Sequence, residues 1–143
     1  MDDFPEPLYE EIPHPGDLSI VVCAPRLPEL YRRAGLALFA LLLERPGTEA
    51  QAPRQADIRG ADPEDLMHAW LSHLLSRFYA DREVVGGIRV RQLEPRRIRA
   101  DLDCAPYARE RHGPVREIKA VTFHQLAVRP AGGGWEARVT FDV

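Results

Sequence analysis

The stretch that decides the fold is a pair of apolar-rich runs near the C-terminus, Ile118-Lys119-Ala120-Val121-Thr122-Phe123-His124 and Trp135-Glu136-Ala137-Arg138-Val139-Thr140-Phe141-Asp142-Val143. In the second run apolar and polar residues alternate, and this period of two is typical of a β-strand with one buried face. Gly132-Gly133-Gly134 separates the runs and predicts a turn. We therefore expect a closing β-hairpin in which Phe141 and Val143 share the buried face and anchor the last strand.

Two helices are expected before this hairpin. Apolar residues recur at helical spacing from 27 to 43, and the second half of this segment is apolar nearly all round, so it should lie deep in the core. Asp62 is a suitable N-cap for the second helix, and Pro63 fits its first turn. A continuous apolar stripe then extends to Phe78.

Weaker strand patterns surround the helices, at 8–12, 18–24, 54–60, 84–93 and 97–102, while 104–114 is expected to be a polar loop. The order strand, helix, strand, helix and then a run of strands favours the α+β class, with two helices packed on mainly antiparallel sheet. A length of 143 residues predicts a single domain over 1–143, with a mobile tail at 1–7.

Composition narrows the function classes. Hydrophobic residues make up 45% and charged residues 29% of the chain, which is ordinary for a soluble globular protein. The net charge of −3 disfavours nucleic-acid binding by this chain alone. No apolar run approaches the ~20 residues that span a bilayer, and the start of the chain is unlike a signal peptide, so we expect a cytoplasmic protein. Cys23 and Cys104 are expected to be buried free thiols.

No nucleotide-binding or nucleophile-elbow motif is present in the sequence. Of the histidines, His68 and His73 are expected at the surface or rim of the second predicted helix. His124 lies in an apolar strand pattern and is expected to be buried and hydrogen-bonded. His14 and His112 lie in predicted loops, and their roles stay open.

Two carboxylates give the one chemical indication. Asp17 follows a Pro-Gly turn at the start of a strand, and Asp142 lies on the polar face of the last strand. Carboxylates and backbone carbonyls are hard oxygen ligands of the kind that calcium or magnesium accepts. An aspartate in such a turn is more often a turn former than a ligand. A metal site requires that Asp17 and Asp142 be neighbours, which their spacing does not show.

Several motifs, in order, resemble the archease family. They are Tyr9-Glu10-Glu11-Ile12-Pro13-His14-Pro15-Gly16-Asp17-Leu18, Asp65-Leu66 with Trp70-Leu71, the run from Ile118 to His124, and Val139-Thr140-Phe141-Asp142-Val143. The resemblance implies a strand–helix–strand–strand (SHS2-like) module with a helix-bearing insertion. It also implies a protein that is not itself an enzyme.

The function implied by this resemblance is activation of the GTP- and manganese-dependent RNA-splicing ligase that joins tRNA halves. Members of the family promote the ligase's guanylylated histidine intermediate and so permit multiple turnover. Contact with RNA would be indirect, through the ligase, and no membrane is involved.

The resemblance also implies a bound divalent cation, usually calcium, with magnesium or manganese as alternatives. Its ligands would be the carboxylates of Asp17 and Asp142 and the main-chain carbonyl of Val143. The family commonly has His-Thr-Ala-Asp where this chain has His14-Pro15-Gly16-Asp17, a turn that is stiffer at Pro15 and looser at Gly16.

Two other function classes are possible interpretations of the residues. A small metal-dependent hydrolase would need a general base and an electrophile clamp beside the metal, for which His14 or His124 with Lys119 are candidates. A generic chaperone or adaptor is the third class. Neither has a sequence signature of its own.

Overall fold

The computed structural model describes residues 9–13, 16–47 and 52–143, so the expected tail at 1–7 and the His14-Pro15 turn lie outside the described residues. In chain order the elements are β1 (Glu10–Ile12), β2 (Asp17–Ala24), α1 (Leu27–Leu42), β3 (Ala52–Arg59), α2 (Pro63–Asp81), β4 (Glu83–Glu94), β5 (Arg97–Pro106), α3 (Arg109–His112), β6 (Ala120–Ala131) and β7 (Gly134–Asp142).

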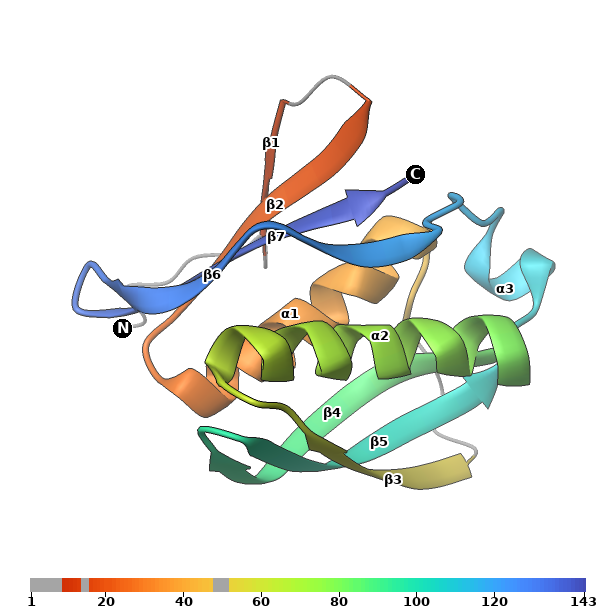
Figure 1. Cartoon of the computed structure of the whole chain (residues 1–143). Helices are drawn as coiled ribbons and strands as arrows, with labels where there is room; N and C mark the ends of the chain where they lie inside the picture. The colour runs from red at the N-terminus through yellow and green to blue at the C-terminus, as the bar shows by residue number, and fades with distance from the viewer. Residues whose placement is uncertain (1–8, 14–15, 48–51) are drawn as a thin grey trace.

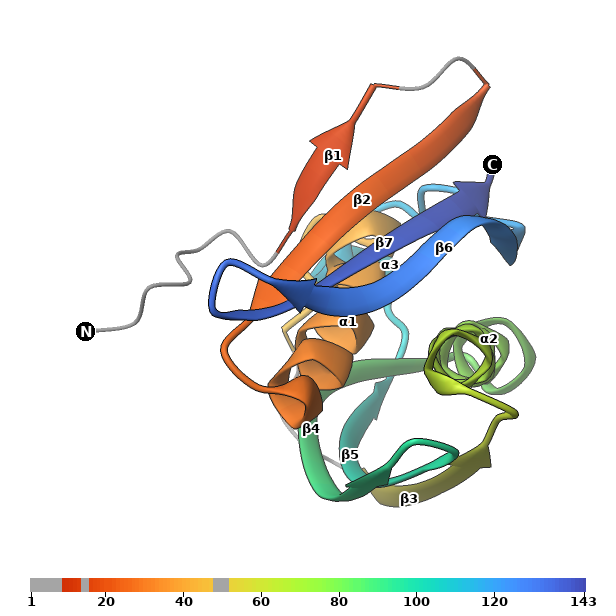
Figure 2. The same cartoon turned by 60° about the vertical axis from the view of Figure 1, so that its left-hand side comes forward.

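The two long helices lie between two sheets (Figures 1 and 2). Within the described residues the strands form two antiparallel sheets, one in the order β1-β2-β7-β6 and one in the order β3-β5-β4. α1 packs on β2 and β7 on one side and on β4 on the other, while α2 packs on β6 and on the second sheet. The predicted α+β class is confirmed.

The chain order explains the two sheets. β2, α1, β6 and β7 come from the two ends of the chain and form one strand–helix–strand–strand unit. β3, α2, β4 and β5 lie between α1 and β6 in the sequence and carry the second sheet. The predicted module with a helix-bearing insertion is therefore confirmed.

Buried side chains join the two helices. Trp70 and Tyr31 are both buried, and the indole Nε1–H of Trp70 donates to the Tyr31 carbonyl at 2.8 Å. The Tyr31 hydroxyl donates to the Pro63 carbonyl at 2.7 Å, at the start of α2. The Asp62 side chain caps α2 by accepting from the Asp65 N–H at 2.8 Å, as the sequence predicts. Polar groups that apolar packing would otherwise leave without partners are thus paired.

The closing hairpin forms at the predicted glycines. Gly132 and Gly133 have φ of 56° and 81°, and two successive positive φ values are typical of the type I′ turn that suits a two-residue hairpin. β7 lies between β6 and β2, so the last strand is an interior strand of its sheet. Phe141 is buried as predicted. The prediction that Val143 shares this buried face is wrong, because β7 ends at Asp142 and Val143 is exposed.

The pairing of β6 with β7 contains an irregularity that the sequence does not predict. Thr122 pairs with Thr140 and Ala127 pairs with Arg138, so residues 123–126 lie opposite Val139 alone. Such a bulge leaves the extra residues outside the ladder. His124 lies in this segment and is exposed, so the prediction of a buried histidine is wrong.

The structure tests three further predictions, which concern Cys104, Cys23 and the segment 104–114. Cys104 is buried as predicted, and burial raises the pKa of its thiol to about 11. Cys23 is exposed, contrary to prediction, because alternation along β2 turns it to the face away from the helices. The segment expected to be a polar loop contains α3, whose His112 is buried and accepts a hydrogen bond at Nδ1 from the Ala108 N–H at 3.0 Å.

Candidate functional site

Asp17 and Asp142 are brought together by the pairing of β2 with β7. Their Cα atoms are partners in the antiparallel register, although the two residues lie near opposite ends of the chain. Directly opposed residues project from the same face of a sheet, with Cβ atoms about 4.5–5.5 Å apart. The neighbour relation on which a metal site depends is therefore present.

The backbone at both aspartates is held by the residues next to them in the chain. Leu18 and Phe141 form the adjacent register pair, and both side chains are buried in the core. Gly16 lies just before β2 with φ of 79°, a left-handed conformation that glycine adopts without steric cost. Gly16 thus permits the turn that leads into Asp17.

β6 adds a third strand beside Asp142. Ala120 is its register partner on that side, and the Lys119 N–H donates to the Asp142 carbonyl at 2.7 Å. Lys119 is the only lysine in the sequence. Asp142 and Val143 are exposed, and Asp17 is half-buried.

The donor chemistry of this corner fits a hard cation. Two carboxylates and the Val143 carbonyl are oxygen ligands of the kind calcium accepts, although calcium takes about six to eight. Within the described ranges no group of three or more His, Cys, Asp or Glu side chains is arranged to hold an ion, so the protein would supply only part of a coordination shell. The role of Asp17, Asp142 and Val143 as metal ligands stays a prediction.

A groove between α2 and the first half of β6 meets this corner, and we call it the α2–β6 groove. It has a volume of about 320 Å³ and is lined by His68, Ser72, Leu75, Ser76, Tyr79, Lys119, Ala120 and Val121. His68 is half-buried and its Nε2 lies 2.9 Å from the Val121 carbonyl, which agrees with the expected rim position. Ala120 both lines the groove and pairs with Asp142, so the groove lies beside the end of the strand that carries Asp142.

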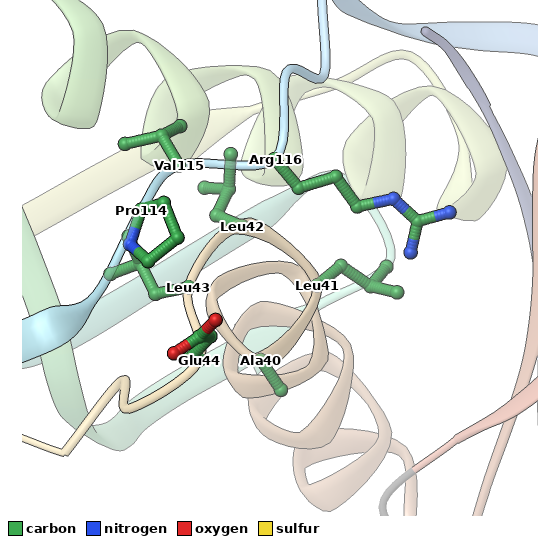
Figure 3. Close-up of a pocket in the computed structure, with 8 residues that line it drawn as sticks. All are labelled: Ala40, Leu41, Leu42, Leu43, Glu44, Pro114, Val115 and Arg116. Atoms are coloured by element: carbon green, nitrogen blue, oxygen red, sulfur yellow. The ribbon is translucent and has the colours of Figure 1, made fainter.

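A second hollow, of about 330 Å³, lies at the C-terminal end of α1 (Figure 3). Its walls are mainly apolar, and its charged side chains are Glu44 and Arg116, which point to different sides of the helix end. Lone charges that do not converge offer no acid–base pair. This hollow therefore gives no support to a hydrolase.

The histidines considered for a hydrolase are His14 and His124. His124 is exposed in the β6 bulge. His14 falls outside the described residues. None of the described helices is long and apolar enough to cross a membrane.

Comparison with known proteins assigns the family. The profile of the Archease protein family (MTH1598/TM1083) matches residues 9–143. Protein archease of Methanosarcina mazei is 30% identical over 139 residues, which cover 94% of this chain and 95% of the relative. Protein archease of Methanopyrus kandleri is 29% identical over 138 residues, which cover 94% of this chain and 99% of the relative.

A solved structure agrees with these matches. The solution structure of Methanobacterium thermoautotrophicum protein 1598 superposes with a TM-score of 0.72 and 25% identity, covering 95% of this chain and 99% of the other. The chain therefore belongs to the archease family, and this membership supports a role as a protein cofactor of an RNA-processing ligase.

Proposed function

We propose that this protein activates a GTP- and manganese-dependent RNA-splicing ligase, promoting guanylylation of the ligase and its multiple turnover in tRNA splicing or RNA repair. Family membership over residues 9–143 supports this role. The protein itself would not be the catalyst. It would act in the cytoplasm and contact RNA only through the ligase.

The activating centre, in this proposal, is a divalent cation held by Asp17, Asp142 and the Val143 carbonyl, with calcium first and magnesium or manganese as alternatives. The observation that supports it is the opposed register of Asp17 and Asp142 on β2 and β7. Like charges directly opposed across a sheet are destabilising, and a cation between them would remove that repulsion. When bound, the ion supplies a positive charge able to attract phosphate oxygens.

The residues of this chain have defined tasks in such a centre. Asp17 and Asp142 would bind the ion, and the buried pair Leu18 and Phe141 would keep the two strand ends in register. The hydrogen bond from Lys119 to the Asp142 carbonyl would hold β6 against the same strand end. Rigid placement of ligands favours binding, because less conformational entropy is lost.

The test uses the RNA-splicing ligase of the same organism with tRNA halves, measuring guanylylated ligase and the number of turnovers. We expect multiple turnover with the wild-type protein and its loss with Asp17→Asn and with Asp142→Asn. Asp57→Asn, which changes an exposed carboxylate on the other sheet, is the matched control and should activate fully. Full activation by both site variants would exclude the metal-centre mechanism.

Two outcomes would favour the other function classes. Phosphatase or esterase turnover by the isolated protein, lost in Asp142→Asn, would support a small hydrolase. Capture of many unrelated proteins and no RNA ligase would support a general chaperone or adaptor.

A further inference from the structure

Arg138 lies on the face of the β1-β2-β7-β6 sheet that points away from the two long helices. Its neighbours Ala137, Val139 and Phe141 in β7 turn toward the helices and are buried. Side chains alternate between the two faces of a strand, so Arg138 and Asp142, four residues apart, project from the same outer face. Figure 2 shows α1 and α2 together on the other side of this sheet.

The guanidinium group of Arg138 has no partner within the described residues, and its Nε is buried. Every other described arginine that is not exposed donates to a carboxylate; these are Arg32, Arg33, Arg77 and Arg97. A charge that is partly removed from water without a partner costs stability. Buried polar groups of this kind are exceptions that call for a specific explanation, such as a bound ion or ligand.

The carboxylates nearest to Arg138 on this face do not neutralise it. Glu136, two residues earlier in β7, accepts instead from Nη2 of Arg129 at 3.0 Å. The register partner of Arg138 on β2 is Val21, and Glu10 lies beyond Val21 on the edge strand β1. Glu10 forms no ion pair in the part of the chain that the structure describes. The charge of Arg138 is therefore available to an anion from outside the chain.

A pair of hydroxyl groups separates Arg138 from Asp142 on this face. Ser19 and Thr140 are register partners, both are buried, and their hydroxyl oxygens lie 2.8 Å apart. Because these hydroxyls bond to each other, they do not serve Arg138 as acceptors. They form a polar support between the arginine and the paired aspartates.

The spacing along β7 indicates the kind of anion. The Cα atoms of Arg138 and Asp142 are about 14 Å apart at the usual rise of a strand. A guanidinium group binds phosphate or carboxylate oxygens through two parallel hydrogen bonds. A divalent cation on Asp17 and Asp142 would attract phosphate oxygens at the other end of the row. A single carboxylate would contact one of these cationic groups, whereas consecutive groups of a polyphosphate chain can contact both.

We propose that Arg138 is a phosphate-binding residue and that the sheet face from Arg138 to Asp142 binds the triphosphate of GTP. The cation on Asp17 and Asp142 would hold one end of the triphosphate, and the Arg138 guanidinium would hold the other. The assignment rests on the proposed function for the cation and for the identity of the nucleotide. It adds a substrate and a positioning residue to that function.

The experiment measures the Kd of the isolated full-length protein for GTP by isothermal titration calorimetry, with calcium in excess over the nucleotide. Arg138→Gln should weaken binding by about tenfold or more, because a charge-assisted pair of hydrogen bonds is lost. Inorganic triphosphate should compete with GTP, and guanosine should not. Chelation of calcium should weaken binding by the wild-type protein.

Folding and position are controlled in the same series. Removal of a partly buried, unpaired charge should leave the thermal unfolding midpoint of Arg138→Gln equal to that of the wild type or above it. Inorganic triphosphate should raise the midpoint of the wild type and not that of Arg138→Gln. Arg99→Gln, which changes an exposed side chain on the other sheet, is the position control and should bind GTP normally.

The results that would overturn this assignment differ from those that test ligase activation. Wild-type affinity of Arg138→Gln for GTP would exclude Arg138 as a phosphate ligand. Failure of the wild-type protein to bind GTP or triphosphate, with ligase activation intact, would reject the nucleotide site and retain the proposed function. Failure to activate the ligase, with GTP binding intact, would reject the proposed function alone. Binding of a single-stranded RNA oligonucleotide but not of GTP would assign Arg138 to a nucleic-acid backbone instead.

Discussion

One pair of opposed carboxylates differs from the carboxylate–arginine pairs found across strands of the two sheets. On the β3-β5-β4 sheet Asp57 lies opposite Arg99, and Asp101 lies opposite Arg89. On the β1-β2-β7-β6 sheet Asp17 lies opposite Asp142. Opposed charges of unlike sign stabilise an antiparallel pair, and opposed charges of like sign destabilise it.

Side-chain contacts extend this contrast. Arg97 donates to both carboxylate oxygens of Asp57 at 2.8 and 2.6 Å, and Arg89 donates to Asp103 at 2.9 Å. Exposed pairs of this kind contribute modestly to stability and are screened by salt. Arginine side chains thus accompany Asp57 and Asp103 on the inserted sheet. The proposed metal centre predicts a different role for the opposed aspartates of the other sheet.

Among the variants considered, Asp142→Arg should have the largest effect. It places an arginine opposite Asp17, just as arginines lie opposite Asp57 and Asp101 on the other sheet. We expect ligase activation to fall to the level without this protein, because one ligand of the proposed centre is replaced by a cation. The free energy of unfolding should be unchanged or higher by about 0.2–1 kcal/mol, since a like-charge pair becomes an unlike-charge pair. Guanylylation assays and urea unfolding measure the two effects.

That variant also tests whether the contrast has a functional meaning. If Asp142→Arg folds and still activates the ligase, the opposed aspartates are not required and the proposed centre is wrong. Asp101→Arg, which changes a carboxylate of the other sheet, is the matched control and should retain activation.

Stabilisation by calcium should depend on Asp17 but not on Asp101, and we expect this effect to be smaller than that of Asp142→Arg. A ligand that binds only the folded state at 100 times its Kd raises the free energy of unfolding by about 2.7 kcal/mol. We expect the unfolding midpoint of the wild type to rise with calcium and to return when the ion is chelated. Asp17→Asn should remove the rise, and Asp101→Asn should retain it. An equal rise in Asp17→Asn would place the ion elsewhere.

The smallest expected effect concerns Asp57 and has a defined pH dependence. The hydrogen bond and charge of Arg97 lower the pKa of Asp57 from its ordinary value of 3.8. Between the lowered pKa and 3.8 the unfolded chain binds more protons, so the contribution of Asp57 is present above pH 3.8 and is lost as the pH falls through the lowered value.

Asp57→Asn should therefore lower the urea midpoint slightly at pH 7, and the difference from wild type should shrink as the pH falls below 3.8. A difference that stays constant down to acid pH would show that the ion pair is not its source. Activation of the ligase should be the same for both proteins at neutral pH.

Local rules predict most of the elements. The N-cap at Asp62, the stripe ending at Phe78 and the turn at Gly132 and Gly133 all appear where expected. These features depend on residues close together in the sequence, where side-chain spacing and backbone preference act directly. The α3 helix is not predicted, since its four residues are too few to show a period.

The errors have a common cause. Three residues are predicted to be buried because their neighbours in the sequence are apolar, yet they are exposed: His124, Cys23 and Val143. His124 is exposed by the β6 bulge, Cys23 by the outward face of β2, and Val143 by the end of β7. Which face of a strand is covered, and where its ladder stops, depends on partners that the strand's own residues do not specify.

The sequence by itself determined the helices, the alternating strands and, through its motifs, the archease family with Asp17, Asp142 and Val143 as candidate ligands. Only the tertiary structure decided that Asp17 and Asp142 are opposed and that Tyr79 and Lys119 line one groove between α2 and β6. The physical reason is that periodicity acts over a few residues, whereas strand register is set by the burial of pairs such as Leu18 with Phe141, which meet only when the whole core forms.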